Sequence, residues 1–359
     1  MDRRPGDENA QDEVSVAGEQ QSGRSPVRLI DETDRIHSKL EQALFEMKRV
    51  IVGQDEMLER VLVGLLSGGH LLLEGVPGLA KTLTIKTLAG VLGGTFQRVQ
   101  FTPDLVPADL VGTRIYRPNT GDFDTELGPV FCNFLLADEI NRAPAKVQSA
   151  LLEVMQEQQV TIGPRTFTVE SPFLVMATQN PIESEGTYPL PEAQVDRFMM
   201  KVVVDYPSFS EEMEVVRRSL MDPARLRRVL GTNEVLAYQK AAMAIYVDRP
   251  VSEYAVALTL ATRDPAGFGK PALDPYISFG ASPRGSINLV RAAQSLALMR
   301  GRRYALPADV QDLAKDVLRH RMVLTYEALA EEVTPDKILD ELIDAVPVPA
   351  VHLAGGSEA

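Results

Sequence analysis

One stretch of the sequence, residues 70–82, constrains the fold more than any other. It reads His-Leu-Leu-Leu-Glu-Gly-Val-Pro-Gly-Leu-Ala-Lys-Thr: a short apolar run, a turn with glycine and proline, and the start of a helix-compatible segment. A strand, a glycine-bearing loop, Lys-Thr and a helix together hold a nucleoside triphosphate, because backbone N–H groups and the helix N-terminus surround phosphate oxygens. The sequence therefore predicts a phosphate-binding loop made of Gly75, Val76, Pro77, Gly78, Leu79, Ala80, Lys81 and Thr82.

Two side chains of this loop have predicted roles. Lys81 can reach the β- and γ-phosphates, and the Thr82 hydroxyl can bind Mg²⁺. The general pattern has glycine just before the lysine, whereas this chain has Ala80, which is acceptable if its φ is negative and its methyl group clears the phosphates. The alternative interpretation is an ordinary Gly/Pro turn between a strand and a helix. Motifs elsewhere in the chain are needed to choose between this turn and a phosphate-binding loop.

Composition limits the class of protein. The chain has 359 residues with 45% hydrophobic residues, enough for two domains with their own cores. A net charge of −13 disfavours sequence-independent nucleic-acid binding. The single cysteine, Cys132, lies in an apolar segment, which predicts core packing and excludes an intrachain disulfide. Without a signal-peptide core or a run long enough to span a bilayer, we expect a cytoplasmic protein.

The order of patterned segments predicts two domains between two tails. Residues 1–28 are polar and expected to be disordered, and helical spacing begins at Asp34. Strand-like and helix-like segments then alternate, which predicts a parallel α/β sheet with helices on both faces. Later segments are helical, without strand patterning. The predicted units are an α/β domain at 29–208 with hairpins near 112–126 and 159–169, a helical linker at 209–229, a helical domain at 230–345 and a flexible tail at 346–359.

An apolar strand that ends in two adjacent acids supplies the next part of a nucleotide site. Phe134–Ala137 is followed by Asp138 and Glu139. At the carboxyl edge of a parallel sheet, Asp138 would hold Mg²⁺, and Glu139 would orient and deprotonate the attacking water. Alone, the pair is equally compatible with acids at the start of a loop. Its position after the phosphate loop favours the metal and water roles.

Three further side chains complete the predicted constellation, each with a plainer alternative. Asn180, after another strand, could fix the water or a γ-phosphate oxygen, or could simply form an Asn-Pro turn. Arg197 could stabilise transition-state charge on a neighbouring subunit's γ-phosphate, or could pair locally with Asp196 or Glu192. Arg284, in the first turn of a helix that opens with Ser-Pro, could swing onto a bound phosphate or be an ordinary surface arginine.

These segments resemble signatures of the AAA+ ATPases, and within them the MoxR-type family, over roughly residues 34–340. The resemblance is carried by Gly-Val-Pro-Gly-Leu-Ala-Lys-Thr (75–82), Leu-Ala-Asp-Glu-Ile-Asn-Arg-Ala (136–143), Ala-Thr-Gln-Asn-Pro (177–181), Pro-Glu-Ala-Gln-Val-Asp-Arg-Phe (191–198) and Ala-Ser-Pro-Arg (281–284). Alanine before the Walker A lysine is usual in that family. The roles it implies are Walker A for Lys81 and Thr82, Walker B for Asp138 and Glu139, sensor 1 for Asn180, arginine finger for Arg197 and sensor 2 for Arg284.

The resemblance also implies a fold and an activity. The fold is a five-stranded parallel P-loop sheet sandwiched by helices, followed by an all-helical lid. The two hairpins resemble inserts shared with magnesium-chelatase ATPase subunits. The activity is Mg²⁺-dependent ATP hydrolysis in a ring, usually a hexamer. It would drive chaperone-like remodelling or maturation of a client protein, often beside a partner with a von Willebrand factor A domain.

Three rival functions remain open at this point. A magnesium-chelatase-like ATPase subunit shares the implied architecture. A nucleic-acid motor is disfavoured by the acidic balance of the chain. A nucleotide-gated scaffold that never hydrolyses ATP is disfavoured because Asp138 and Glu139 are both present.

Overall fold

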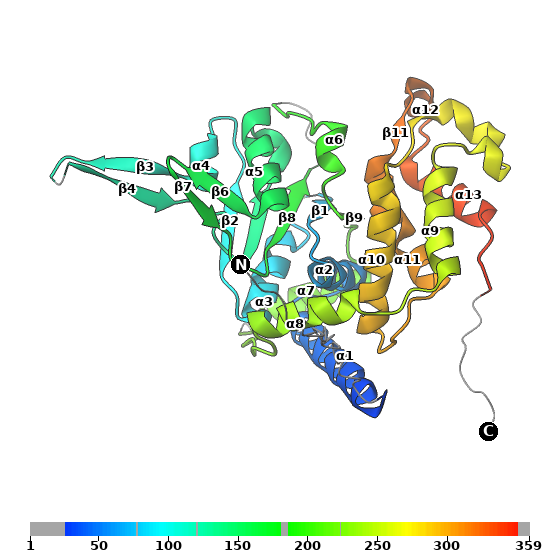
Figure 1. Ribbon diagram of the computed structural model, residues 1–359, viewed down its shortest axis with the longest axis horizontal. Helices are drawn as coiled ribbons and strands as arrows, with labels where there is room; N and C mark the ends of the chain where they lie inside the picture. Colours follow the sequence, from blue (N-terminus) through cyan, green and yellow to red (C-terminus); the bar gives the residue numbers. More distant parts are fainter. Residues whose placement is uncertain (1–25, 77, 120, 181–185, 223, 351–359) are drawn as a thin grey trace, which may run out of the picture.

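The computed structural model describes residues 26–76, 78–119, 121–180, 186–222 and 224–350. At its centre is a five-stranded sheet with the order β2-β5-β8-β1-β9, in which every neighbouring pair is parallel (Figure 1). This confirms the predicted parallel α/β sheet. Its strands are β1 (Leu71–Glu74), β2 (Phe96–Gln100), β5 (Phe134–Asp138), β8 (Leu174–Gln179) and β9 (Met200–Val203).

Helices cover both faces of this sheet. Alternate strand residues enter two separate apolar clusters: Leu71 and Leu73 pack with the first, and Leu72 with the second. Burial on both faces explains why the strands read as continuous apolar runs. The first cluster joins the sheet to α1 (Pro26–Lys48), α2 (Asp55–Leu66) and α3 (Lys81–Leu92); the second joins it to α4 (Pro107–Val111) and α5 (Ala145–Glu157).

The second cluster contains the single cysteine. Cys132 is fully buried as a free thiol. Burial raises the pKa of this thiol to about 12, so it stays protonated at neutral pH. Cys132 therefore acts as a small apolar packing group, as predicted.

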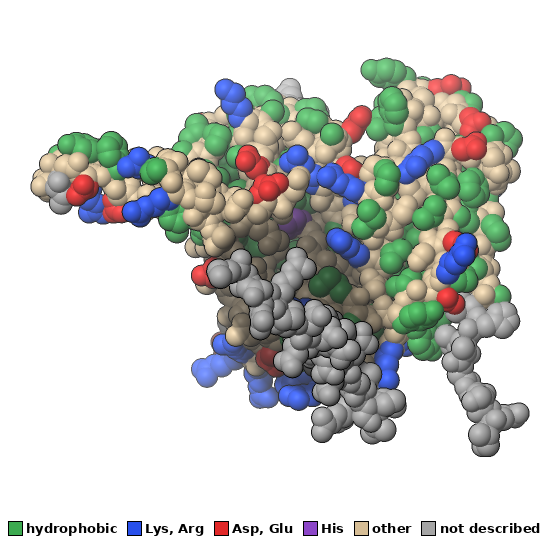
Figure 2. All heavy atoms as spheres, viewed as in Figure 1, with side chains coloured by type: hydrophobic (Ala, Val, Ile, Leu, Met, Phe, Trp, Pro, Cys, Tyr) green, Lys and Arg blue, Asp and Glu red, His purple; other side chains and the backbone are tan. Residues whose placement is uncertain are grey.

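Two antiparallel hairpins lie at the positions indicated by the sequence. The first pairs β3 (Gly112–Arg117) with β4 (Asp122–Leu127), and it projects away from the rest of the molecule (Figure 1). The second pairs β6 (Gln159–Ile162) with β7 (Arg165–Thr168). Figure 2 shows hydrophobic side chains along one edge of the projecting hairpin.

The chain beyond the sheet is mainly helical, and α8 to α13 are here called the lid. Its apolar side chains join the first cluster, so lid and sheet share one core. A short antiparallel pair, β10 (Ile277–Phe279) with β11 (Val323–Leu324), interrupts the helices. We expected no strands here, because segments this short carry no detectable alternation. The helices are α6 (Glu192–Val195) and α7 (Phe209–Ser219) before the lid, then α8 (Thr232–Met243), α9 (Arg249–Ala261), α10 (Pro283–Met299), α11 (Pro307–Leu318), α12 (Tyr326–Ala330) and α13 (Pro335–Ala345), with 3₁₀ turns at Ile140–Arg142, Ala266–Phe268, Pro271–Tyr276 and Arg319–Arg321.

The two ends of the chain differ partly from expectation. Helix α1 begins at Pro26, ahead of Asp34 where apolar spacing starts, so residues 26–28 of the expected disordered tail are helical. Proline is well tolerated in the first turn of a helix. The remainder of that tail, and residues 351–359 of the expected flexible end, lie outside the described residues. In the part of the chain that the structure describes, no helix is long and apolar enough to cross a membrane.

A buried arginine ties α2 to the lid. The Arg60 side chain is only 4% exposed, and it lies 2.8 Å from both Asp312 and Asp316 of α11. Burial of such a guanidinium is tolerated because both carboxylates neutralise it. This contact fixes one side of the lid against α2.

Buried His70 predicts a pH-dependent stability. Its Nδ1 accepts a hydrogen bond from the Val175 N–H at 3.0 Å, so Nε2 carries the proton and donates to the Met155 carbonyl at 3.0 Å. Burial lowers the pKa of His70 from 6.5 to about 4. Because the unfolded chain binds this proton more readily, stability is full above pH 6.5 and falls as the pH approaches 4, with about 2 kcal/mol lost at pH 5.

This prediction can be measured by urea unfolding at pH 7.5 and pH 5. His320 also has a pKa lowered by burial, so the wild-type loss contains both histidines. The difference between wild type and His70→Gln isolates His70: the variant should lose about 2 kcal/mol less than wild type over this range. Equal losses in the two proteins would contradict the assignment.

Candidate active site

The register of the sheet brings the predicted site residues to one edge. Gln100 of β2 is paired with Asp138 of β5, and Leu73 of β1 with Thr178 of β8. Ala137 is paired with Ala177, so Asp138 lies between Gln100 and Thr178. Because parallel strands all end on the same side, their polar terminal residues face one region of space. The sequence alone did not supply this register.

The loop after β1 makes a tight turn into α3. Gly75 is required here, because a Cβ atom would lie 2.5 Å from the carbonyl oxygen of Val204. Ala80 has a φ of 56°, in the left-handed region, so the condition of a negative φ at this position is not met. Such a conformation costs about 1–2 kcal/mol for alanine. The turn is held by Thr84, whose N–H and hydroxyl donate to the Ala80 carbonyl at 2.8 Å and 3.0 Å; Pro77 lies outside the described residues.

Lys81 opens helix α3 and points back into the loop. Its ammonium group donates a hydrogen bond to the Gly75 carbonyl. Burial lowers the pKa of Lys81, while the negative charges of Asp138, Glu74 and Glu139 oppose that shift. A partly desolvated ammonium beside these acids gains strongly from an anionic partner. Thr82 follows in the same first turn and lines the same cavity.

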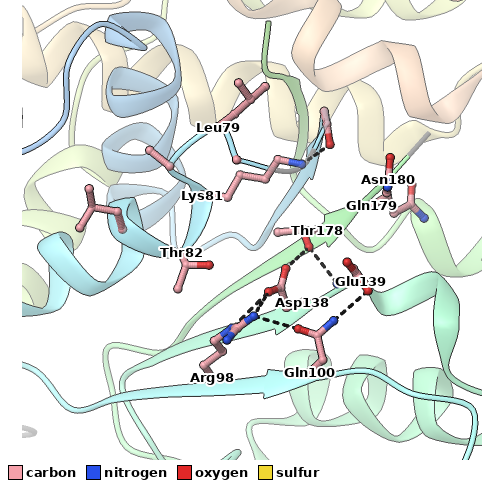
Figure 3. Close-up of a pocket in the computed structure, with 14 residues that line it drawn as sticks. Leu79, Lys81, Thr82, Arg98, Gln100, Asp138, Glu139, Thr178, Gln179 and Asn180 are labelled. Carbon is pink, nitrogen blue, oxygen red and sulfur yellow. Dashed lines mark hydrogen bonds and ion pairs between the residues drawn. The ribbon is translucent and has the colours of Figure 1, made fainter. Parts of the chain in front are cut away.

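Three polar neighbours, Arg98, Gln100 and Thr178, bond the two adjacent acids (Figure 3), and Arg142 also pairs with the Glu139 carboxylate at 3.2 Å. Asp138 accepts a 2.6 Å hydrogen bond from the Thr178 hydroxyl at Oδ1, and at Oδ2 it accepts bonds from Arg98 at 2.7 Å and 3.1 Å. The Glu139 N–H donates to the Thr178 hydroxyl at 2.8 Å. The Glu139 carboxylate accepts a 2.8 Å bond from the Gln100 amide. Both carboxylates are therefore oriented before any ligand arrives.

Sequence reasoning missed these three neighbours. Thr178 stands within the Ala-Thr-Gln-Asn-Pro string, but no role was predicted for it. Arg98 and Gln100 alternate along a strand and so share one face, and Arg98 also bonds the Gln100 side chain at 2.9 Å. Two long polar side chains at alternate positions of one strand, β2, were the available signal. Their target became visible only through the pairing of β2 with β5.

A polar cavity and an apolar groove meet at the phosphate loop. The cavity has a volume of about 420 Å³ and is lined by Gly75, Gly78, Leu79, Ala80, Lys81, Thr82, Leu83, Arg98, Gln100, Asp138, Glu139, Thr178, Gln179 and Asn180. The groove, of about 460 Å³, shares Gly78, Leu79, Ala80 and Leu83 with it and extends to Val50, Ile51, Val52, Gln54, Tyr206, Pro207, Glu212, Val215, Arg218 and Ser219. A polar end continuous with an apolar end suits a ligand with a charged tail and a flat ring. No motif in the sequence indicated the groove.

The structure brings five of the seven predicted functional side chains to this cavity. Four are those of Lys81, Thr82, Asp138 and Glu139. The fifth is Asn180, which follows β8 directly and is 8% exposed. These five side chains lie at or just after the carboxyl ends of three strands, β1, β5 and β8, as the order of the motifs in the sequence indicates.

Arg197 and Arg284 lie elsewhere. Arg197 precedes β9 and so lies at the amino end of that strand. The cavity lies beyond the carboxyl ends of the strands, and the four residues of β9, which span about 13 Å, lie between them. Arg197 is exposed in a separate hollow between α5 and α6, beside Ser149 and Gln194. Arg284 contacts the Asp196 carboxylate at 3.4 Å, next to Arg197. The two arginines thus form a second group at the opposite end of the sheet.

The donor set at the cavity fits Mg²⁺. The Thr82 hydroxyl and the Asp138 carboxylate are hard oxygen ligands, and Mg²⁺ is usually bound through one or two such groups together with substrate phosphates and water. Asp138 Oδ2 already pairs with the Arg98 cation, which shows that this oxygen faces positive charge. Within the described ranges there is no cluster of three or more His, Cys, Asp or Glu residues that could hold a metal by themselves.

Comparisons with known proteins agree with this geometry. A family model described as "ATPase family associated with various cellular activities (AAA)" matches residues 70–200, and a model of the "AAA lid domain" matches residues 271–342. Chaperone MoxR1 of Mycobacterium tuberculosis is 58% identical over 87% of this chain and 83% of its own length. Protein MoxR of Methylorubrum extorquens is 31% identical over 85% of this chain and 93% of its own. A crystal structure from Cytophaga hutchinsonii has a TM-score of 0.84 and 48% identity, and covers 89% of this chain and 98% of the other.

Proposed function

Because this chain belongs to the MoxR-type AAA+ ATPase family, we propose that it hydrolyses ATP to ADP and phosphate with Mg²⁺, at sites shared between copies of itself. The observation that carries the proposal is the meeting of Lys81, Asp138 and Glu139 at one cavity beside the phosphate loop. A bound cation, a phosphate-binding loop and a positioned carboxylate are the parts that phosphoryl transfer to water requires.

Binding uses both parts of the site. The apolar groove takes the adenine ring, and the loop with Lys81 takes the β- and γ-phosphates. Thr82 and Asp138 would hold Mg²⁺, which supplies charge neutralisation on the phosphate oxygens. Arg98 gives up its bond to Asp138 Oδ2 when that oxygen is needed by the metal or its waters.

Hydrolysis depends on Glu139. Its carboxylate orients the attacking water and accepts its proton, while Asn180 at the same cavity helps to fix the water or a γ-phosphate oxygen. The Thr178 hydroxyl bonds both the Asp138 side chain and the Glu139 N–H, so it fixes these two acids relative to each other. Gln100 holds the Glu139 carboxylate until the substrate is in place.

The second arginine group completes the site of a neighbouring copy. Arg197 and Arg284 lie at the end of the sheet opposite their own cavity, and Arg197 is exposed. A head-to-tail arrangement would bring them to the cavity of the next copy, and such heterologous contacts form a ring when the rotation between copies closes. We therefore assign a homo-oligomeric ring, a hexamer by family resemblance, with Arg197 as the finger.

The work done by hydrolysis is chaperone-like remodelling or maturation of a client protein. One close relative carries the name Chaperone MoxR1. The projecting hairpin offers exposed apolar side chains for a client, with Ile115, Tyr116 and Phe123 46%, 52% and 56% exposed. By resemblance, we propose a cytoplasmic location and a client reached through a von Willebrand factor A domain partner.

Substitution of Lys81 tests nucleotide binding directly. We expect Lys81→Ala to weaken the binding of a fluorescent ATP analogue about 10- to 100-fold, because a charge-assisted hydrogen bond to phosphate contributes about 1.5–3 kcal/mol. Phosphate release should fall to background. The matched control is Lys86→Ala, an exposed lysine of the same helix. Equal loss in both variants, or Mg²⁺-independent hydrolysis by the wild type, would refute the proposed site.

A further inference from the structure

A buried arginine of the lid reaches the segment that carries Arg197. The Arg321 side chain is 0% exposed, and all five of its N–H groups donate hydrogen bonds. Four of these bonds leave the lid and end on one short segment. The acceptors are the Asp196 carboxylate at 2.9 Å, the carbonyls of Asp196 at 3.2 Å, Phe198 at 2.6 Å and Met199 at 3.1 Å, and the Val317 carbonyl within the lid.

These bonds flank Arg197 on both sides. The carbonyls before and after it belong to Asp196 and Phe198, and one guanidinium holds both. The Asp196 carboxylate also accepts bonds from the Ser282 hydroxyl at 3.1 Å and 3.0 Å, and it pairs with Arg284 at 3.4 Å. The start of α10 and the backbone around Arg197 are therefore joined through one carboxylate.

From this geometry we propose that Arg321 and Asp196 are positioning residues for Arg197. They bind its backbone to the lid, so that Arg197 and Arg284 are presented to the neighbouring copy as one rigid unit. The proposal rests on the proposed function of Arg197 as a finger. It adds a source of control: a movement of the lid in one copy displaces the finger that serves the next copy's ATP.

The chemistry of the contact supports a positioning role. Arg321 presents a planar fork of donors that lysine cannot reproduce, because an ammonium has three donors and no fixed plane. Burial lowers the pKa of Arg321 to about 10, while Asp196 opposes that shift, so the group stays charged at neutral pH. A charged, fully bonded guanidinium holds its acceptors in one arrangement.

The test uses copies that serve only as finger donors. A Lys81→Ala copy has a disabled cavity and an intact Arg197, so it is the finger donor. An Arg197→Ala copy has an intact cavity and lacks the finger. Hydrolysis in a mixture of the two therefore depends on Arg197 of the donor. Adding Arg321→Lys to the donor should lower the restored turnover about 10- to 100-fold, since a displacement near 1 Å costs about 10²-fold. Asp196→Asn in the donor should also lower the restored turnover. This variant replaces Arg321→Lys in the test if Arg321→Lys does not fold.

The matched control is Arg60→Lys in the same donor. Arg60 is another buried arginine that contacts the lid, but it ties α2 to α11, and none of its ion pairs within the described part of the chain reaches the segment around Arg197. This donor should restore turnover to within about threefold of the simple Lys81→Ala donor, because its finger segment is untouched. Full restoration by the Arg321→Lys and Asp196→Asn donors would overturn the inference. An equal loss with Arg60→Lys would also overturn it, because general loosening of the lid would then explain the result.

A second measurement separates this inference from the proposed function. If the simple Lys81→Ala and Arg197→Ala mixture shows no restored turnover, the finger assignment itself fails. Hydrogen exchange of residues 192–199 then decides the positioning role alone. Faster exchange in Arg321→Lys than in Arg60→Lys supports it, and unchanged exchange in Arg321→Lys overturns it.

Discussion

Replacing Arg197 with alanine is expected to lower ATP turnover about 10³–10⁵-fold, since a finger supplied by a neighbour stabilises charge only in the transition state. ATP binding should remain close to the wild-type level. The reason is geometric: Arg197 lies outside its own cavity, at the opposite end of the sheet. Binding of a fluorescent ATP analogue and phosphate release, measured on the same preparation, separate the two effects.

The same variant also tests the assignment to a neighbouring copy. Mixing Arg197→Ala with Lys81→Ala should restore part of the turnover, because mixed interfaces then pair an intact cavity with an intact arginine. Arg249→Ala is a suitable control, since this arginine is 86% exposed on α9 and pairs with Glu253. No recovery at any mixing ratio, with oligomers intact, would exclude Arg197 as a finger.

Replacing Glu139 with glutamine should reduce turnover about 10²–10⁴-fold, which is the usual contribution of a positioned general base. Glutamine keeps the size of the side chain but cannot take a proton from water. ATP and Mg²⁺ should still bind, because Lys81, Thr82 and Asp138 are unchanged. The bond that the backbone N–H of residue 139 donates to the Thr178 hydroxyl is also preserved, so the loop should keep its shape.

Single-turnover hydrolysis measures this prediction without interference from product release. Glu253→Gln makes the same chemical change at an exposed position on α9 and should leave turnover unchanged. Parental turnover in Glu139→Gln would show that another group is the base. Because this variant should hold ATP without hydrolysing it, it is also the form to use for capturing a client protein.

Much of the fold follows from local patterns. The apolar runs of β1, β5 and β8 are long enough and continuous enough to indicate buried parallel strands. The strands β10 and β11 are too short for any pattern, and they were missed. The φ of Ala80 was also missed, because alanine by itself disfavours the left-handed region and only the closed turn imposes it.

In the candidate site, too, local motifs predicted some residues, and others became apparent only from long-range contacts. Lys81, Thr82, Asp138 and Glu139 were predicted from their motifs, and the sheet brings them together. Thr178, Arg98 and Gln100 were missed, since each acts on a partner 39 or 40 positions away in sequence. The apolar groove was missed for the same reason, because it joins residues near 50 to residues near 206.

The sequence by itself determined the class of protein, the candidate phosphate loop and the side chains proposed to bind phosphate and metal, because those features depend on residue type and short spacing. Only the tertiary structure decided that Arg197 and Arg284 lie together, away from their own cavity and held by Asp196 and Arg321. Those contacts join positions 86 to 125 residues apart, and they form only when the lid packs against the start of β9. Their placement therefore depends on the folded core, which no local pattern encodes.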